Sequence, residues 1–168
     1  MIQPVIVMER ILTEERDLFE KIYELEGKKS EAIIKRDGNA IEKLSLEQES
    51  LLAVVADLES KREEQIRAYV RENAIEDLPK SVTLRDIVVS MDEDSSRHLM
   101  RLGIELKRLL EKLSDLKNTN ERLIRDNMAF YNMLISGLRS SSYIETGYKS
   151  DGRHNGINAN PLFFNKTA

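Results

Sequence analysis

The feature that most constrains this chain is an apolar repeat in its second half. Between Leu99 and Gly137, twelve positions follow one another at alternating steps of three and four residues, and nine of them are apolar, which predicts a coiled-coil-like stripe along one long helix. These positions are Leu99, Leu102, Leu106, Leu109, Leu113, Leu116, Asn120, Leu123, Asn127, Phe130, Leu134 and Gly137. A helix with one apolar stripe is not stable alone in water. It needs partner helices from this chain, a second copy or another protein.

The rest of the chain predicts the partner helices. Pro4 suits the first turn of a helix, and the run Asp37-Gly38-Asn39 is a turn that separates two apolar-periodic segments. Asn39 with Glu42 is expected to cap the second segment. Because the connection is short, these two helices should pack antiparallel as a hairpin. The predicted helices cover about residues 4–36, 39–73, 83–91 (a short one) and 92–138.

The expected fold is all-α: an elongated, coiled-coil-like, antiparallel three-helix bundle with a short connector helix that covers one end. The long helix is expected to begin at the capping box Ser90–Glu93 and to end at Gly137 and the serines after it. Residues 1–139 would form this bundle. Residues 140–168, rich in Gly, Asn and Ser, would form a flexible C-terminal tail because they cannot build a core.

Composition excludes several classes of protein. The net charge is −4 and no basic stripe is visible, which argues against a nucleic-acid partner. Cysteine is absent, so disulfides and thiolate metal sites are excluded. No apolar run approaches the roughly 18 residues of a membrane span, and no signal peptide is recognisable. We expect a cytoplasmic protein with no stable membrane insertion.

No catalytic or metal-binding constellation is visible. His98 and His154 are the only histidines, and neither lies among acids at metal-ligand spacing. His98 is expected on a solvent-exposed helix surface. A glycine-rich phosphate loop and a nucleophile beside a base are both missing from the sequence. We therefore predict no enzyme activity, no metal and no cofactor.

Two asparagines, Asn120 and Asn127, occupy the same heptad position in the apolar stripe. One interpretation is that they set the register of the bundle by hydrogen bonding across it, a well-attested role of buried asparagine. The other is that the stripe opens here and contacts a different molecule.

The apolar surface of the long helix widens beyond Asn120, where a second row joins the stripe. The wider surface consists of Leu123, Ile124, Asn127, Met128, Phe130, Tyr131, Leu134, Ile135 and Leu138. It could pack under the first hairpin as ordinary core. Alternatively, it could be a docking surface for another protein, for which the adaptable methionine side chain is suited.

Several segments resemble the FlgN family of flagellar export chaperones. They are Glu24-Leu25-Glu26-Gly27-Lys28-Lys29, Ala32-Ile33-Ile34-Lys35-Arg36-Asp37, Leu51-Leu52, Leu58-Glu59-Ser60-Lys61-Arg62 and Asn120-Glu121-Arg122-Leu123. The segment Tyr148-Lys149-Ser150-Asp151-Gly152 is similar to the C-terminal pattern of the family, although Lys149 stands where the family prefers glycine. In their order and spacing, these segments cover roughly residues 11–152.

The resemblance implies a cytoplasmic chaperone that binds the C-terminal helical region of hook-associated proteins. It would prevent their premature assembly and deliver them to the type III export gate. By position, the surface between Leu123 and Leu138 would bind the client. Tyr148, Asp151 and Gly152 would dock to the cytoplasmic domain of the export gate.

The alternative function is that of a structural coiled-coil protein that self-associates and has no role in export. The sequence leaves open whether the free protein is a monomer or a homodimer, and which hook-associated protein is preferred. It also assigns no role to the apolar group Leu162-Phe163-Phe164 in the tail.

Overall fold

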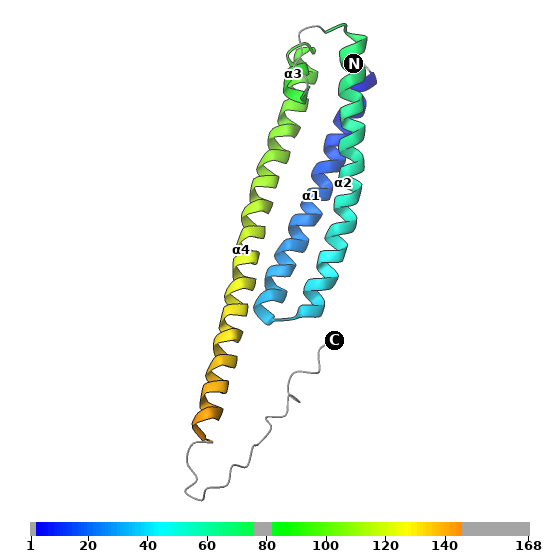
Figure 1. Cartoon of the computed structure of the whole chain (residues 1–168). Coiled ribbons are helices and arrows are strands. Elements are labelled where there is room, and N and C mark those ends of the chain that lie inside the picture. The colour runs from blue at the N-terminus through cyan, green and yellow to red at the C-terminus, as the bar shows by residue number, and fades with distance from the viewer. Residues whose placement is uncertain (1–2, 76–81, 146–168) are drawn as a thin grey trace, which may run out of the picture. The chain divides into compact units, whose positions relative to one another are not determined.

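The computed structural model describes residues 3–75 and 82–145, and these are almost entirely helical. The elements are α1 (Gln3–Lys35), α2 (Gly38–Glu72), the short α3 (Leu84–Val88) and α4 (Glu93–Glu145) (Figure 1). The predicted all-α class, with three long helices and a short connector helix, is confirmed. The chain divides into two units, Met1–Asp126 and Asn127–Ala168, which are described separately.

In the first unit, α1 and α2 form the predicted antiparallel hairpin (Figure 1). Gln48 Nε2 of α2 donates to the carbonyl oxygen of Ile22 in α1 at 3.1 Å. Further from the turn, Arg62 Nε lies 3.6 Å from Glu15 Oε1. Residue numbers thus rise along α2 as they fall along α1, which is the pattern of an antiparallel pair.

Contacts between α1 and α4 show that these two helices are parallel, unlike α1 and α2. His98 Nε2 lies 2.8 Å from Glu9 Oε1, and Arg16 Nη1 lies 3.7 Å from Glu105 Oε2. Because residue numbers rise together along both helices, α4 is parallel to α1 and antiparallel to α2. The three long helices therefore alternate in direction along the chain, up for α1, down for α2 and up for α4.

The residues that cap α2 and α4 each differ by two positions from the predicted caps. Asp37, not Asn39, caps α2, because its Oδ1 accepts a hydrogen bond from Ala40 N at 3.0 Å. Asp92, not Ser90, caps α4, since its Oδ1 accepts from Ser95 N at 3.0 Å.

Buried apolar side chains from all four helices form a core near α3. This core consists of Val5, Met8, Leu12, Ile66, Tyr69, Ile87, Val88, Leu99, Leu102 and Leu106. Ile87 is fully buried in it, so the short helix covers one end of the bundle as predicted. Along α4 the core ends at Leu106, and the next stripe residues, Leu109 and Leu113, are only half-buried.

The prediction that α4 ends near Leu138 is wrong, because the helix continues to Glu145. It passes through Gly137 and the following serines. A single glycine costs a helix only about 1 kcal/mol relative to alanine, and serine is of intermediate helix propensity. No proline lies between 138 and 145, so this stretch holds no strong stop signal. Residues 140–145, which were assigned to the tail, are therefore part of α4.

Candidate functional site

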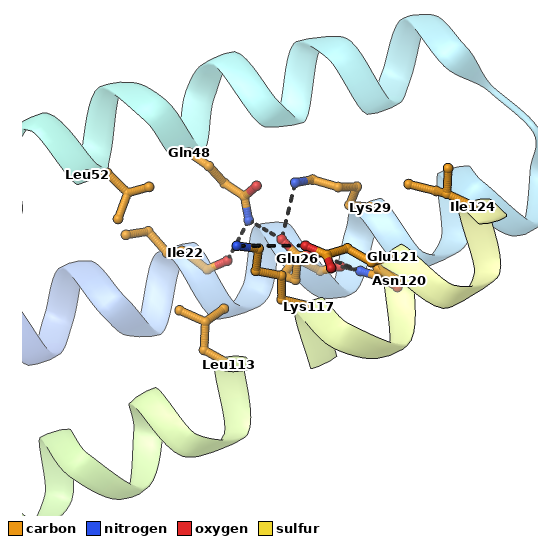
Figure 2. A pocket seen from close by; sticks show the side chains of 10 residues that line it. All are labelled: Ile22, Glu26, Lys29, Gln48, Leu52, Leu113, Lys117, Asn120, Glu121 and Ile124. Atoms are coloured by element: carbon orange, nitrogen blue, oxygen red, sulfur yellow. Dashed lines mark hydrogen bonds and ion pairs between the residues drawn. The ribbon is translucent and has the colours of Figure 1, made fainter. Parts of the chain in front are cut away.

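A pocket of about 350 Å³ lies in the first unit, with side chains of α1, α2 and α4 around it (Figure 2). Its lining residues are Ile22, Glu26, Lys29, Gln48, Leu52, Leu113, Lys117, Asn120, Glu121 and Ile124. In Figure 2, α1 runs between α2 and α4, so α1 forms the floor of the pocket and the other two helices form its walls.

The base of the pocket is a polar layer formed by Glu26, Lys29, Ser30, Gln48 and Asn120. The Glu26 side chain is buried and accepts hydrogen bonds from Asn120 Nδ2 and Gln48 Nε2, both at 2.8 Å. Lys29 Nζ lies 3.2 Å from the same carboxylate. Asn120 is only 2% exposed, and its Oδ1 accepts from Ser30 Oγ at 2.7 Å. The layer therefore ties all three long helices together through one carboxylate (Figure 2).

The electrostatics of Glu26 follow from these partners. Burial alone would raise its pKa, because a charged carboxylate loses water. Hydrogen bonds from Asn120, Gln48 and Lys29, together with the charge of Lys29, outweigh burial and hold the pKa of Glu26 below its usual value. The carboxylate is thus a satisfied anion and not a proton donor at neutral pH.

The geometry decides between the two interpretations of Asn120. Its Nδ2 donates to both the side chain and the backbone carbonyl oxygen of Glu26, the latter at 3.0 Å. Asn120 therefore hydrogen-bonds across the bundle, and the stripe is closed at this position. Asn127 belongs to the second unit, where it is half-buried.

A second polar contact, between the buried Glu15 and the half-buried Arg62, was not predicted from the sequence. Glu15 is 2% exposed, and within the described residues neither its Oε1 nor Arg62 Nε has a hydrogen-bond partner. Burial raises the pKa of Glu15; the charge of Arg62 opposes this rise, and that of Glu59 adds to it. The sequence feature that could have indicated this contact is the charged Glu15 inside the apolar stripe of α1.

His98, which was expected on a solvent-exposed helix surface, is half-buried and contacts two charged residues. Its Nε2 lies 2.8 Å from Glu9 Oε1, and its Nδ1 lies 2.9 Å from Arg101 Nη2. Because a guanidinium can only donate, Nδ1 accepts and Nε2–H donates to Glu9. His98 thus links α4 to α1. His154 lies outside the described residues, and within them no group of three acids or histidines could hold a metal ion.

The predicted client-binding residues follow one another along α4. Six of them are between 36% and 67% exposed: Ile124, Met128, Phe130, Tyr131, Leu134 and Leu138. The other three, Leu123, Asn127 and Ile135, are half-buried. The rings of Phe130 and Tyr131 meet edge to face, with 6.4 Å between their centroids. The predicted gate-docking residues Tyr148, Asp151 and Gly152 lie outside the described residues.

None of the helices in the described part of the chain combines the length and the hydropathy needed to span a bilayer.

The model of the family described as "FlgN protein" matches residues 6–156 of this chain. No curated protein and no solved structure shows significant similarity. The resemblance inferred from the sequence is therefore confirmed, and so is the prediction that the chain is not an enzyme. Since the match covers most of its length, the chain belongs to the FlgN family, the non-enzymatic flagellar export chaperones for hook-associated proteins.

Proposed function

We propose that this protein binds the C-terminal helical region of a hook-associated protein in the cytoplasm, prevents its premature assembly and delivers it to the export gate. The proposed client surface comprises Leu123, Ile124, Asn127, Met128, Phe130, Tyr131, Leu134, Ile135 and Leu138 of α4. The observation that carries the proposal is the concentration of exposed apolar side chains there: six of the nine, between Ile124 and Leu138, are at least 36% exposed. Exposed apolar patches of this kind mark interaction sites.

The width of this surface supports a helical client. At 3.6 residues per turn, the nine positions span an arc of about 160° around α4. A helix that packs against one neighbour needs an apolar arc nearer to about 100°. The additional width can accept an amphipathic helix laid along α4, and Met128 can adjust to side chains of imprecise shape.

Delivery uses a different part of the chain in this proposal. Tyr148, Asp151 and Gly152 contact the cytoplasmic domain of the export gate, while α4 holds the client. Because the two contacts are separate in sequence, Tyr148→Ala should weaken binding to the gate domain and leave client affinity unchanged. Equal loss of both affinities in a titration would contradict this division.

Calorimetric titration of the full chain with C-terminal segments of hook-associated proteins from the same genome tests client binding. Met128→Glu should weaken binding by at least about tenfold, because it places a charge in the apolar contact. Met100→Glu is the matched control: Met100 is an exposed methionine near the opposite end of α4, and its substitution should change affinity less than about twofold. Absence of binding, or equal loss in both variants, would refute the proposal.

The alternative of a self-associating coiled coil makes a distinct prediction. A mass measurement over a range of concentrations would then give one stable oligomer from the chain alone, with no binding of the hook-associated segments. Under the chaperone proposal the segments bind whether the free chain is a monomer or a homodimer.

A further inference from the structure

We infer that the pocket between α2 and α4 is a second client contact, which takes an amphipathic helix with a basic flank. The inference rests on the proposed function, since it names the hook-associated client as the occupant. It extends the client contact from α4 alone to a groove with two walls, one of which is α2.

The chemistry of the pocket favours an apolar occupant. Four aliphatic side chains line it: Ile22, Leu52, Leu113 and Ile124. The buried polar atoms at its base satisfy one another within the polar layer. The unsatisfied buried atoms found among the described residues belong to Glu15, Arg62 and Ser95, and none of these lines the pocket. The base of the pocket therefore offers a polar ligand no buried atom that lacks a partner, whereas aliphatic side chains would find matching surface.

The spacing along the walls favours a helix as the occupant. On α4, Leu110, Lys117 and Ile124 follow at steps of seven, and both leucine and isoleucine are more than a third exposed. On α2, Leu52 is 46% exposed although it lines the pocket. Lys117 and Ile124 of the row on α4 and Leu52 on α2 line the same pocket, and such a groove suits an amphipathic helix with anchors at i, i+3 or i+4, and i+7.

The charges of α2 indicate what one flank of the client helix should carry. Between Gly38 and Glu64, α2 has seven acidic and three basic residues. Glu49 stands three residues before Leu52 and shares its face of the helix, whereas Glu59, seven residues after Leu52, pairs with Arg62 Nη2 at 3.4 Å. The opposite wall is close to neutral, because Lys117 Nζ pairs with Glu121 Oε1 at 3.8 Å. The flank of the client helix that faces α2 should therefore be basic.

The same charges disfavour a second copy of this chain as the occupant. The chain carries a net charge of −4, and an α2 helix from a second copy would bring acids against acids. Ile124 belongs both to the pocket and to the proposed client surface, which is why the client itself is named as the occupant.

The test is a titration of the full chain with the C-terminal segments of hook-associated proteins from the same genome. Leu52→Glu should weaken binding by at least about tenfold, while Leu46→Glu should change it less than about twofold. Leu46 is the matched control, because it is an exposed leucine of the same helix that does not line the pocket. Helix content measured by circular dichroism should be equal in both variants.

A second pair of variants tests the charge. Glu49→Lys should weaken binding of the basic-flanked helix by a few-fold, and added salt should reduce the difference from the wild type. Glu47→Lys introduces the same change of charge on α2 at a position that does not neighbour Leu52, and should have a smaller effect. Equal effects of the two lysines would overturn the basic flank.

The outcomes separate this inference from the proposed function. If Met128→Glu weakens binding and Leu52→Glu does not, the pocket is not a client contact although the chaperone proposal stands. If the wild type binds no segment, both fail. If Leu52→Glu changes only the oligomeric mass of the chain itself, the occupant is a second copy and the inference is overturned.

Discussion

Asn120→Leu is the substitution that most directly tests how α4 is held on α1. It preserves the branching and the number of heavy atoms of the side chain but removes the donor that binds the Glu26 carboxylate at 2.8 Å and the acceptor of Ser30 Oγ. Glu26 is 5% exposed, so its carboxylate loses a hydrogen-bond partner while it remains buried.

The expected loss of stability depends on the partners that the Glu26 carboxylate retains in Asn120→Leu. Removing one partner of a buried charge typically costs about 3–5 kcal/mol, and a hydrogen bond to a charged group contributes about 1.5–3 kcal/mol. Glu26 retains Gln48 Nε2 and Lys29 Nζ. We therefore expect Asn120→Leu to lower the free energy of unfolding by about 3 kcal/mol, the lower end of the range for a buried charge that loses a partner.

The double variant Glu26→Leu/Asn120→Leu tests whether the buried charge of Glu26 is what destabilises Asn120→Leu. It removes the buried charge together with its donor, so its free energy of unfolding should lie within about 1 kcal/mol of the wild type. The double variant should thus be more stable than Asn120→Leu by about 2 kcal/mol.

Urea unfolding followed by circular dichroism measures these differences, with Asn118→Leu as the control. Asn118 is exposed on the same helix, and its substitution should change stability by less than about 0.5 kcal/mol. If Asn120→Leu is as stable as Asn118→Leu, or if the double variant is less stable than the single one, the polar layer does not hold α4 in place.

The pH dependence gives an independent check. Because the pKa of Glu26 is lowered in the folded state, its contribution to stability is present above the unfolded value of 4.5 and is lost as the pH falls below it. Acid should therefore destabilise the wild type relative to the double variant. A constant difference between the two from neutral pH to below 4.5 would contradict the assignment.

Four further substitutions test other parts of the bundle. Glu15→Gln should stabilise the protein by about 1 kcal/mol at pH 7, because it removes a buried charge that only approaches Arg62. The raised pKa of Glu15 means that this gain should shrink as the pH falls, which unfolding at several pH values would show. Tyr69→Ala should cost about 3–5 kcal/mol in urea unfolding, since the ring is 1% exposed in the core. Asp37→Ala should cost about 1 kcal/mol through loss of the α2 cap, whereas Asn39→Ala should have little effect on thermal stability.

Local chemistry explains why the helix spans could be predicted. The first two long helices begin and end one residue from their predicted bounds, because Pro4 and the Asp37–Asn39 turn act on the neighbouring backbone alone. The cap residues were less predictable. Asp37 and Asn39 both suit an N-cap, and which one is used depends on where the chain leaves α1. At Arg36, a positive φ of 58° ends α1 and makes Asp37 the cap.

Contacts between helices could not be predicted in the same way. A charged residue in an apolar stripe, such as Glu15, indicates a buried partner but does not identify Arg62, which is 47 positions away in the chain and on another helix. The same holds for His98, whose partner Glu9 is on α1. The exposed positions along α4 were predicted as a surface, and their role as a client site stays a prediction.

The sequence by itself determined the class of this protein: the stripe of alternating three- and four-residue steps requires a long helix with partners, and the motif order indicates the FlgN family. Both depend on spacing along one chain, which is a local property. Only the tertiary structure decided that Asn120 meets Glu26 and Gln48, and that a pocket remains between α2 and α4. Those facts depend on how three helices are rotated and shifted against each other, and that arrangement results from the packing of all of their side chains together.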